Sequence, residues 1–215
     1  MQGPELQVGF AVNGVPLTEA PLRSRGGRPG DRLLLSRPLG SGALFAAHMQ
    51  ARADGRDVEH ALALMEEGNA EAGALALAHG ARALTDVTGF ALAGHLLAML
   101  DDGLAARVEV DAIPLLPGFL RAVEAGIYST AHESNERAFA PSVTSGPSAA
   151  GDARVPAGRN VDVLYDPQTG GGLLMALPAD RAGAALAALA AGGAGAAIIG
   201  TLCEATPSSE PILLT

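Results

Sequence analysis

Two short polar loops hold the residues of this sequence that are best suited to bind a ligand. The first follows an apolar run over 81–85 and contains Asp86, Thr88 and Gly89, just before a helical pattern begins. Carboxylate oxygen is the ligand that a hard cation such as Mg²⁺ prefers, and backbone N–H groups at a helix start favour anions such as phosphate. Asp86 is therefore a candidate metal ligand. The alternative is that Asp86 or Thr88 only caps the helix, since Asp and Thr are common cap residues.

The second loop covers 166–172 and combines polar side chains with three consecutive glycines. Glycine lets the backbone approach a ligand in conformations that other residues avoid, and Gln168 and Thr169 would supply hydrogen-bond donors beside it. The alternative is a tight connection between strands expected over 161–165 and 173–177. Because α/β proteins place the groups that hold phosphates and metals in such loops, we expect the two loops to form one site.

Other residues with reactive side chains show no spacing that indicates a second site. The five histidines do not combine with a cysteine or a glutamate base as zinc sites require, so we expect them on the surface or in helix packing. They are His48, His60, His79, His95 and His132. We expect Cys203, which follows an apolar run, to be a core thiol. Asn69 is expected to cap a helix, and Asn135 to be solvated on a polar helix face.

Charge and composition argue against several functions. The 215-residue chain has a formal net charge of -9, whereas a protein that binds nucleic acid needs a basic face. All 14 positively charged residues are Arg, so no lysine is present for a phosphate site or a Schiff base, and a bound nucleotide would need a metal. The single cysteine rules out an internal disulfide and fits a reducing compartment. No run approaches the roughly 20 apolar residues of a membrane span, and we expect a cytoplasmic protein.

Apolar strand patterns interleave with Ala-rich and Leu-rich helix patterns along most of the chain. Strands are expected over 6–12, 32–36, 81–85, 107–110, 161–165, 173–177 and 197–202. Helices are expected after Gly42 through Met49, from an N-cap at Asp57 through Met65, and over 69–79, 89–100, 118–126, 129–139 and 180–191. The stretch 141–158, rich in Ser, Gly, Pro and Ala, predicts a mobile loop. The interleaving predicts an α+β protein of mixed α/β layers.

Taken together, these segments resemble the carboxy-terminal half of the selenophosphate synthetase (selenide, water dikinase) family. The segments that carry the resemblance are 28–31, 33–35, 37–42, 85–96 and 166–174, together with Met65 and Asn69. The similarity covers nearly the whole chain in the right order. Related ATP-dependent enzymes of the same superfamily, such as aminoimidazole ribonucleotide synthetase and thiamine-monophosphate kinase, carry different sequences at the first loop.

The resemblance implies a fold, a reaction and a set of site residues. The fold would be that of the aminoimidazole ribonucleotide synthetase carboxy-terminal domain, a mixed sheet covered by helices. Family members form homodimers of two-domain subunits, bind ATP with Mg²⁺ between the domains, and convert selenide, ATP and water to selenophosphate, AMP and phosphate. Asp86 matches the family's metal-binding aspartate. The residues expected to contact the nucleotide are Thr85, Thr88, Gly89, Gln168, Thr169, Gly170 and Gly171.

The sequence also departs from the family pattern. It has no counterpart of the glycine-rich amino-terminal segment that carries the catalytic Cys or selenocysteine, the Lys and further metal-binding aspartates. We therefore expect residues 1–27 to be the last strand and linker of a missing ATP-binding domain, residues 28–215 to be the carboxy-terminal domain, and the fragment alone to be inactive. Gly170 stands where the family usually has Ser, and Ala91 where it often has Gly. The alternatives are a non-catalytic binding or dimerisation module, or another ATP-dependent enzyme of the superfamily.

Overall fold

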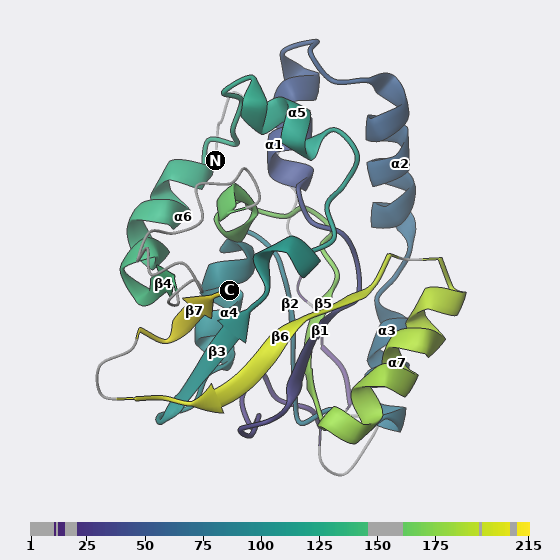
Figure 1. Cartoon of the computed structure of the whole chain (residues 1–215). Coiled ribbons are helices and arrows are strands. Elements are labelled where there is room, and N and C mark those ends of the chain that lie inside the picture. The colour runs from purple at the N-terminus through teal and green to yellow at the C-terminus, as the bar shows by residue number, and fades with distance from the viewer. Residues whose placement is uncertain (1–10, 12, 16–20, 146–160, 194, 207–209) are drawn as a thin grey trace.

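A seven-stranded sheet forms the centre of the computed structural model, which describes residues 11, 13–15, 21–145, 161–193, 195–206 and 210–215 (Figure 1). The strands are β1 (Arg32–Leu35), β2 (Ala83–Asp86), β3 (Leu104–Val108), β4 (Val143–Ser145), β5 (Leu173–Leu177), β6 (Ala197–Glu204) and β7 (Ile212–Leu214). The helices are α1 (Ser41–Met49), α2 (Gly55–Glu66), α3 (Ala70–Ala78), α4 (Ala91–Met99), α5 (Phe119–Glu124), α6 (His132–Phe139) and α7 (Ala179–Ala191). Short 3₁₀ helices are η1 (Val110–Ala112), η2 (Ala140–Ser142) and η3 (Val161–Leu164). The strand expected over 6–12 lies outside the described residues except for Ala11, and the loop expected over 141–158 lies outside them from residue 146 on. The described residues 141–145 are not loop, because they form the end of η2 and β4.

The sheet is mixed, and its strands lie in the order β2-β5-β1-β6-β3-β7-β4. Strand β1 pairs antiparallel with both β5 and β6, and β2 pairs antiparallel with β5 at one edge of the sheet. Toward the other edge, β7 pairs parallel with both β3 and β4. The described residues therefore confirm the predicted α+β class with a mixed sheet covered by helices.

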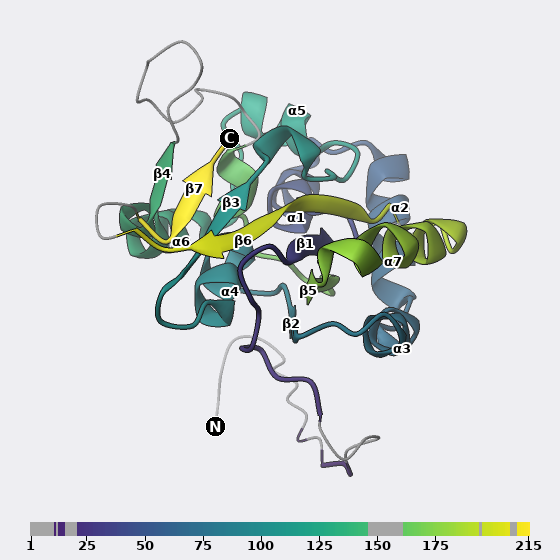
Figure 2. The same cartoon turned by 60° about the horizontal axis from the view of Figure 1, so that its bottom comes forward.

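Alternating side chains of the central strands supply a core on both faces of the sheet, as the period of two along a strand requires. Leu33 and Leu35 of β1 join one buried cluster with residues of α1 and α4, whereas Leu34 joins a second cluster with residues of α3 and α7. All three leucines are fully buried. Figure 2 shows α3 and α7 together on one side of the molecule. The sheet is thus the middle layer between two helix layers.

Helix α4, which follows the first polar loop, is anchored by a leucine face. Leu92, Leu96 and Leu100 are spaced by four residues, and all are buried in the larger core cluster, as the sequence pattern predicts. Gly94 of the same helix lies against the ring of Phe139, where a Cβ atom would come within 2.7 Å of Cζ. This packing fixes the start of α4 relative to the sheet and to α6.

The expectation of a strand over 161–165 is wrong, because Val161–Leu164 forms the 3₁₀ helix η3. The backbone N–H groups of Tyr165 and Asp166 both donate to the Asp162 carbonyl and are not available to a neighbouring strand. The buried apolar side chains of this segment therefore belong to a 3₁₀ helix and not to a strand. A short apolar run does not by itself distinguish a strand from other buried backbone.

Three smaller expectations also differ from the structure. Strand β3 begins and ends earlier than the expected strand over 107–110, because Val110 starts η1. The sequence pattern misses β4 and β7, which are strands of three residues each. The N-cap residue of α2 is Asp54, not Asp57, and its carboxylate accepts a 2.9 Å hydrogen bond from the Arg56 N–H. Asp57 lies inside the helix and pairs with Arg121.

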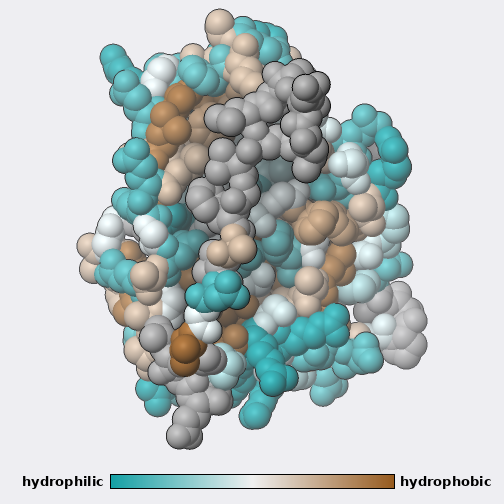
Figure 3. All heavy atoms as spheres, turned by 180° about the vertical axis from the view of Figure 1, so that it is seen from behind, coloured by the Kyte–Doolittle hydropathy of each residue, from teal (hydrophilic) through white to brown (hydrophobic). Residues whose placement is uncertain are grey.

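Hydrophobic side chains form separate patches among hydrophilic ones on the face seen in Figure 3. Among the described residues, Met49 and Phe90 are the most exposed large apolar side chains after Val15, at 80% and 66%. Isolated exposed apolar residues are common in folded proteins. No helix in the described part of the chain is long and apolar enough to cross a membrane.

Candidate functional site

The pairing of β2 with β5 brings the two polar loops together. Antiparallel strands place the end of one beside the start of the other, and Asp86 at the end of β2 lies opposite the first residue of β5. Beyond the strands, the Val87 N–H donates to the Gly172 carbonyl at 3.0 Å, and the Gln168 N–H donates to the Thr88 carbonyl at 3.0 Å. The loop over 86–89 and the loop over 166–172 therefore form one continuous surface.

The glycines of the second loop make this close approach possible. A Cβ atom on Gly171 would lie 1.9 Å from the Val87 carbonyl oxygen, a distance that no side chain tolerates. Gly170 has a φ of 60°, in the left-handed region that glycine adopts without penalty. Its neighbour Thr169 is held by a 2.9 Å hydrogen bond from its N–H to the Ser41 hydroxyl. The triple glycine is therefore a contact between two loops and not a connection between two strands.

Asp86 presents an exposed carboxylate at this junction. Within the described residues its side chain accepts no hydrogen bond and forms no ion pair. The helix cap alternative is wrong for both Asp86 and Thr88: α4 has Phe90 at its N-cap position, and no side chain bonds to the first N–H groups of the helix. Thr88 instead contacts His95, whose Nε2 lies 3.0 Å from the Thr88 nitrogen and 3.1 Å from its hydroxyl oxygen.

Gln168 points into the protein. Its Oε1 accepts hydrogen bonds from the Gly40 and Ser41 N–H groups at 2.9 and 3.2 Å, and so satisfies backbone donors at the start of α1. Its Nε2 donates to the Asp166 carbonyl at 2.7 Å and to Asp166 Oδ2 at 3.0 Å. Both amide protons of Gln168 thus have acceptors inside the protein, and the side chain orients the loop.

Asp166 is a fully buried acid beneath the loop. Its Oδ2 also accepts a 3.0 Å hydrogen bond from the Gly42 N–H, whereas its Oδ1 has no hydrogen-bond partner. Burial raises the pKa of Asp166 to about 7, against the lowering effect of the hydrogen bonds from Gln168 and from the backbone of Gly42 and Ala43, and with a further raising effect from Asp162. Oδ2 thus accepts two hydrogen bonds, and Oδ1 accepts none within the described residues.

The remaining predicted nucleotide contacts lie at the surface of the junction. Gly89, Thr169 and Gly170 are exposed, and Thr85, Thr88 and Gly171 are partly exposed. The Thr85 hydroxyl donates to the Asp86 carbonyl at 3.2 Å. Two cavities border the glycine loop: one of about 20 Å³ between the loop, α1 and α2, and one of about 330 Å³ lined by Pro167 and Thr169 together with residues of α1 and of 128–130. The smaller is far below the size of a nucleotide site, whereas the larger is within the size range of ligand pockets. Thr169 lines both cavities.

The arrangement fits part of a magnesium site. Mg²⁺ usually takes one or two carboxylates plus phosphate oxygens and water, and Asp86 offers one such carboxylate, which has no hydrogen bond or ion pair within the described residues. Within the described residues no group of three or more His, Cys, Asp or Glu side chains is placed to hold a metal ion. Asp86 would therefore need phosphate oxygens or further protein ligands to complete the coordination.

Two amide side chains that support the loops are not recognisable as such from the sequence pattern. Asn135 is buried, not solvated, and its Nδ2 donates to the Gly89 and Tyr165 carbonyls at 2.9 and 3.1 Å. Asn69 occupies the N-cap position of α3 but makes no cap bond, and its Nδ2 donates to the Gly171 carbonyl at 3.1 Å. Each amide ties a helix start or a helix face to a site loop.

His132 is buried, whereas His95 and Cys203 are partly exposed. His95 supports the first loop from α4, and His132 on α6 is buried against the ring of Tyr128, with ring centroids 4.5 Å apart. Burial lowers the pKa of His132, with an opposing effect from Asp162. Cys203 is a free thiol on β6 and is partly exposed rather than fully buried.

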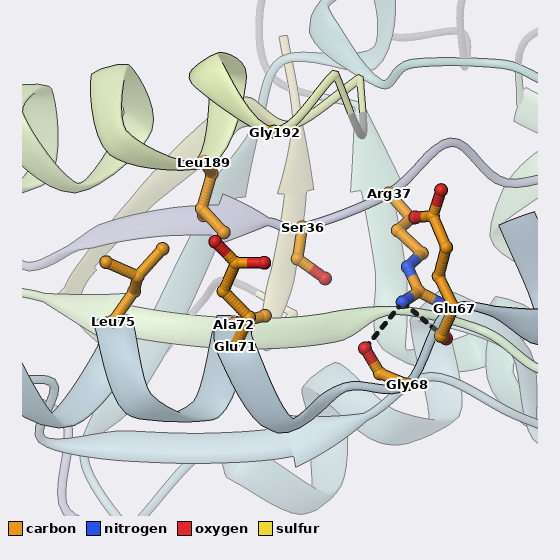
Figure 4. A pocket seen from close by; sticks show the side chains of 9 residues that line it. All are labelled: Ser36, Arg37, Glu67, Gly68, Glu71, Ala72, Leu75, Leu189 and Gly192. Carbon is orange, nitrogen blue, oxygen red and sulfur yellow. Dashed lines mark hydrogen bonds between the residues drawn. The ribbon is translucent and has the colours of Figure 1, made fainter.

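A cavity of about 390 Å³ lies between α3, α7 and the start of the β1–α1 connection (Figure 4). Its lining residues are Ser36, Arg37, Glu67, Gly68, Glu71, Ala72, Leu75, Leu189 and Gly192. The buried Arg37 guanidinium donates to the Leu64, Glu67 and Gly68 carbonyls at 2.7–3.0 Å and is engaged within the protein. The carboxylates of Glu67 and Glu71 would repel phosphate. This cavity contains none of the predicted site residues.

Comparisons with known proteins agree with the fold and with the predicted resemblance. The chain is 37% identical over 174 residues to the selenide, water dikinase of Trichlorobacter lovleyi and 34% identical over 199 residues to that of Geobacter metallireducens. These alignments cover 80% and 91% of this chain but only 48% and 55% of the relatives. The chain thus spans about half the length of the curated relatives it matches.

Solved structures share the fold at lower sequence identity. Hydrogenase maturation protein HypE of E. coli aligns with a TM-score of 0.59 and 18% identity, covering 92% of this chain and 49% of HypE. HypE in complex with ATP aligns with a TM-score of 0.54 and 20% identity, covering 90% of this chain and 49% of that one. Thiamine-monophosphate kinase from Stenotrophomonas maltophilia K279a aligns with a TM-score of 0.55 and 20% identity, covering 90% and 52%.

A family model for "AIR synthase related protein, C-terminal domain" matches residues 28–209. This range begins just before β1 and includes both site loops and the strands β1 to β6. With that match over most of its length, the chain belongs to the family of AIR synthase related protein carboxy-terminal domains.

Proposed function

We propose that this chain is the carboxy-terminal half of a selenide, water dikinase, which forms selenophosphate, AMP and phosphate from selenide, ATP and water. The observation that carries the proposal is the junction of the two loops, where an exposed, unpartnered Asp86 lies beside a glycine backbone in a chain 34–37% identical to such enzymes. The shared fold with HypE, of which a structure in complex with ATP exists, supports ATP as the substrate.

In this proposal the loop over 86–89 binds Mg²⁺, and the loop over 166–172 binds the phosphates of ATP. Asp86 supplies one carboxylate oxygen to the cation, which neutralises phosphate charge when bound. Thr85, Thr88 and Gly89 are neighbours of that carboxylate in the chain, and the backbone of 169–171, which is exposed or partly exposed, would offer a surface for phosphate oxygens. Gln168 contributes indirectly, because its buried amide sets the path of this backbone.

The remaining groups would come from outside the described residues. We propose that residues 28–215 form the carboxy-terminal domain and that residues 1–27 lead from an amino-terminal domain, which would supply the catalytic Cys or selenocysteine, a Lys and further metal-binding aspartates. The assembled protein would be a cytoplasmic homodimer. The isolated chain would make no selenophosphate, because positioning supplies most of the catalysis in phosphoryl transfer and half of the positioning groups would be missing.

The test joins the amino-terminal half of the Trichlorobacter lovleyi relative to this chain and measures selenide-dependent release of AMP and phosphate from ATP. We expect activity from the chimera and none from the chain alone. Selenide-dependent AMP formation by the isolated chain would contradict the division of groups. A folded, dimeric chimera that lacks activity would instead favour a non-catalytic binding or dimerisation module.

The role of Asp86 is tested in the same chimera by Asp86→Asn, which keeps the shape of the side chain and removes its charge. We expect turnover to fall at least about 100-fold while the melting temperature without ligand stays unchanged. Asp102→Asn is the matched control, since Asp102 is an exposed carboxylate just after α4 and away from the loop junction. Near-normal turnover of Asp86→Asn at saturating Mg²⁺ and ATP would refute the metal role.

A further inference from the structure

The backbone N–H of Thr88 has a side-chain acceptor, not a backbone one. In the described residues this N–H donates to His95 Nε2 at 3.0 Å, from the loop to the second turn of α4. A backbone N–H can only donate, so Nε2 must offer a lone pair. The ring proton of neutral His95 is therefore on Nδ1. The Thr88 hydroxyl, 3.1 Å from the same nitrogen, lies on the same side of the ring.

The surroundings of His95 favour the neutral ring that this hydrogen bond requires. Partial burial lowers the pKa of His95, and the charge of Asp86 opposes that effect in part. The ring of Phe90 packs at a tilted angle with its centroid 6.2 Å away and covers part of the imidazole. A protonated Nε2 would be a second donor facing the Thr88 N–H, and the bond would be lost.

Three backbone groups of the loop bond to backbone or amide partners. The Thr88 carbonyl accepts from the N–H groups of Ala91 and Gln168, at 2.9 and 3.0 Å. The Gly89 carbonyl accepts from Asn135 Nδ2, and the Val87 N–H donates to the glycine loop. The imidazole of His95 completes this set by holding the N–H of Thr88, which lies two residues beyond Asp86 in the chain.

We propose that His95, held as the Nδ1–H tautomer, is the positioning residue that orients the Thr88 peptide and thereby sets the direction in which Asp86 presents its carboxylate to a divalent cation. The part concerning the cation rests on the proposed function, whereas the tautomer and the order of the loop do not. His95 does not bind the cation through Nε2, because Thr88 occupies that lone pair.

The first experiment measures the tautomer in this chain without any ligand. Long-range ¹H–¹⁵N spectra of the ¹⁵N-labelled chain at neutral pH distinguish a ring nitrogen that carries a proton from one that does not. We expect the Nε2 of His95 to be unprotonated and its Nδ1 to be protonated. A protonated Nε2 would overturn the proposal, whether or not the protein makes selenophosphate.

The second experiment compares His95→Gln with His95→Met by amide hydrogen exchange at Thr88. The glutamine Oε1 reaches about as far as Nε2 and can accept the Thr88 N–H, whereas methionine has a similar length and no comparable acceptor. We expect exchange at Thr88 to be about three- to tenfold faster in His95→Met and close to wild type in His95→Gln. Equal exchange in all three proteins would overturn the positioning role.

The third readout uses the chimera and its dependence on Mg²⁺ at fixed ATP. His95→Met should raise the Mg²⁺ concentration for half-maximal rate about three- to tenfold, and His95→Gln should restore it to within about twofold of wild type. An unchanged Mg²⁺ dependence in His95→Met, with faster exchange at Thr88, would overturn the link to the cation and leave the tautomer intact. An inactive wild-type chimera would count against the proposed function, and the two ligand-free measurements would still decide the role of His95 in the loop.

Discussion

The two loops of the candidate site use their polar residues in opposite ways. The loop over 86–89 directs the carboxylate of Asp86 to solvent and keeps its backbone groups bonded inside the protein. The loop over 166–172 buries its most polar side chains, Asp166 and Gln168, and exposes backbone and small residues at Thr169 and Gly170. One loop offers a side chain to a ligand, and the other offers a backbone surface.

This difference shows that polarity in a loop does not by itself identify a ligand contact. Gln168 has the donor that a phosphate site needs, yet both of its amide protons bond to Asp166. If the second loop is mainly structural and Asp86 mainly binds a ligand, changes in the second loop should lower the stability of the fold, and a change at Asp86 should affect only ligand binding. The following changes test that division, in order of decreasing expected effect.

Gly171→Ala should have the largest effect, because the added methyl group would lie 1.9 Å from the Val87 carbonyl oxygen and push the loops apart. We expect the free energy of unfolding to fall by about 3 kcal/mol or more, measured by urea denaturation. Gly183→Ala is the control, since a methyl group there meets no atom within 4 Å and replaces a glycine inside α7. That variant should gain about 1 kcal/mol.

Gln168→Met should destabilise the fold by about 2–4 kcal/mol. Methionine has a similar length but leaves the buried N–H groups of Gly40 and Ser41 without the Oε1 acceptor. The control is Gln50→Met, at an exposed glutamine that follows the last residue of α1. It should change the free energy of unfolding by less than about 0.5 kcal/mol. Equal effects in the two variants would show that Gln168 is free to serve a ligand.

Asp166 should make stability depend on pH. Its pKa is about 7 in the folded protein and near 3.8 when unfolded, so its contribution is fully present below pH 3.8 and is lost as the pH rises through 7. We expect the free energy of unfolding of the wild type to fall, relative to Asp166→Asn, by about 1–4 kcal/mol between pH 4 and pH 8. Parallel pH profiles for the two proteins would show that the buried acid does not titrate in this range.

Ala91→Gly should stabilise the protein by about 1 kcal/mol. Ala91 is buried at the start of α4 with a φ of 58°, a conformation that costs an alanine energy and that glycine adopts freely. Ala93→Gly, two residues further along α4 and without a positive φ, should destabilise by a similar amount. Thermal melting of both variants checks the difference in sign.

Asp86→Asn should change the stability of the ligand-free chain least, by less than about 0.5 kcal/mol, since the exposed side chain has no protein partner in the described residues. Urea denaturation without Mg²⁺ and ATP measures this effect. A loss comparable to that of Gln168→Met would mean that Asp86 has a structural role and would remove the contrast between the loops.

The sequence predicts the strands and helices that have strong patterns. It also predicts that the two loops are adjacent, as the structure shows. The leucine period of α4 and the apolar runs of β1, β5 and β6 are long or regular enough to define these elements. The strands β4 and β7 have three residues each, which is too short for a recognisable pattern. They are strands because β7 pairs with β3 and β4 pairs with β7. The 3₁₀ helix η3 has the same apolar composition as a buried strand.

The supporting residues of the site could not be predicted because they act across long sequence separations. Asn135 donates to a carbonyl 46 residues away, and Asn69 to one 102 residues away. The sequence predicts Asp86 as a candidate metal ligand, because that prediction uses only its own carboxylate and the local pattern of strand, loop and helix. It does not predict which polar side chains support the backbone, since that depends on the packing of α3 and α6 against the loops.

The position of β1 in the sheet has a consequence for the order of folding during synthesis. Its two neighbours are β5 and β6, so Leu33 pairs with Ala176 and with Gly200, about 140 and 170 residues later in the chain. On the ribosome, residues 32–35 would be made early and would remain without sheet partners until nearly the whole domain had been translated. At about 5–20 residues per second, this interval lasts on the order of ten seconds or more. The apolar strand β1 would therefore be exposed in the nascent protein for that interval, and a chaperone that bound it would protect it from aggregation.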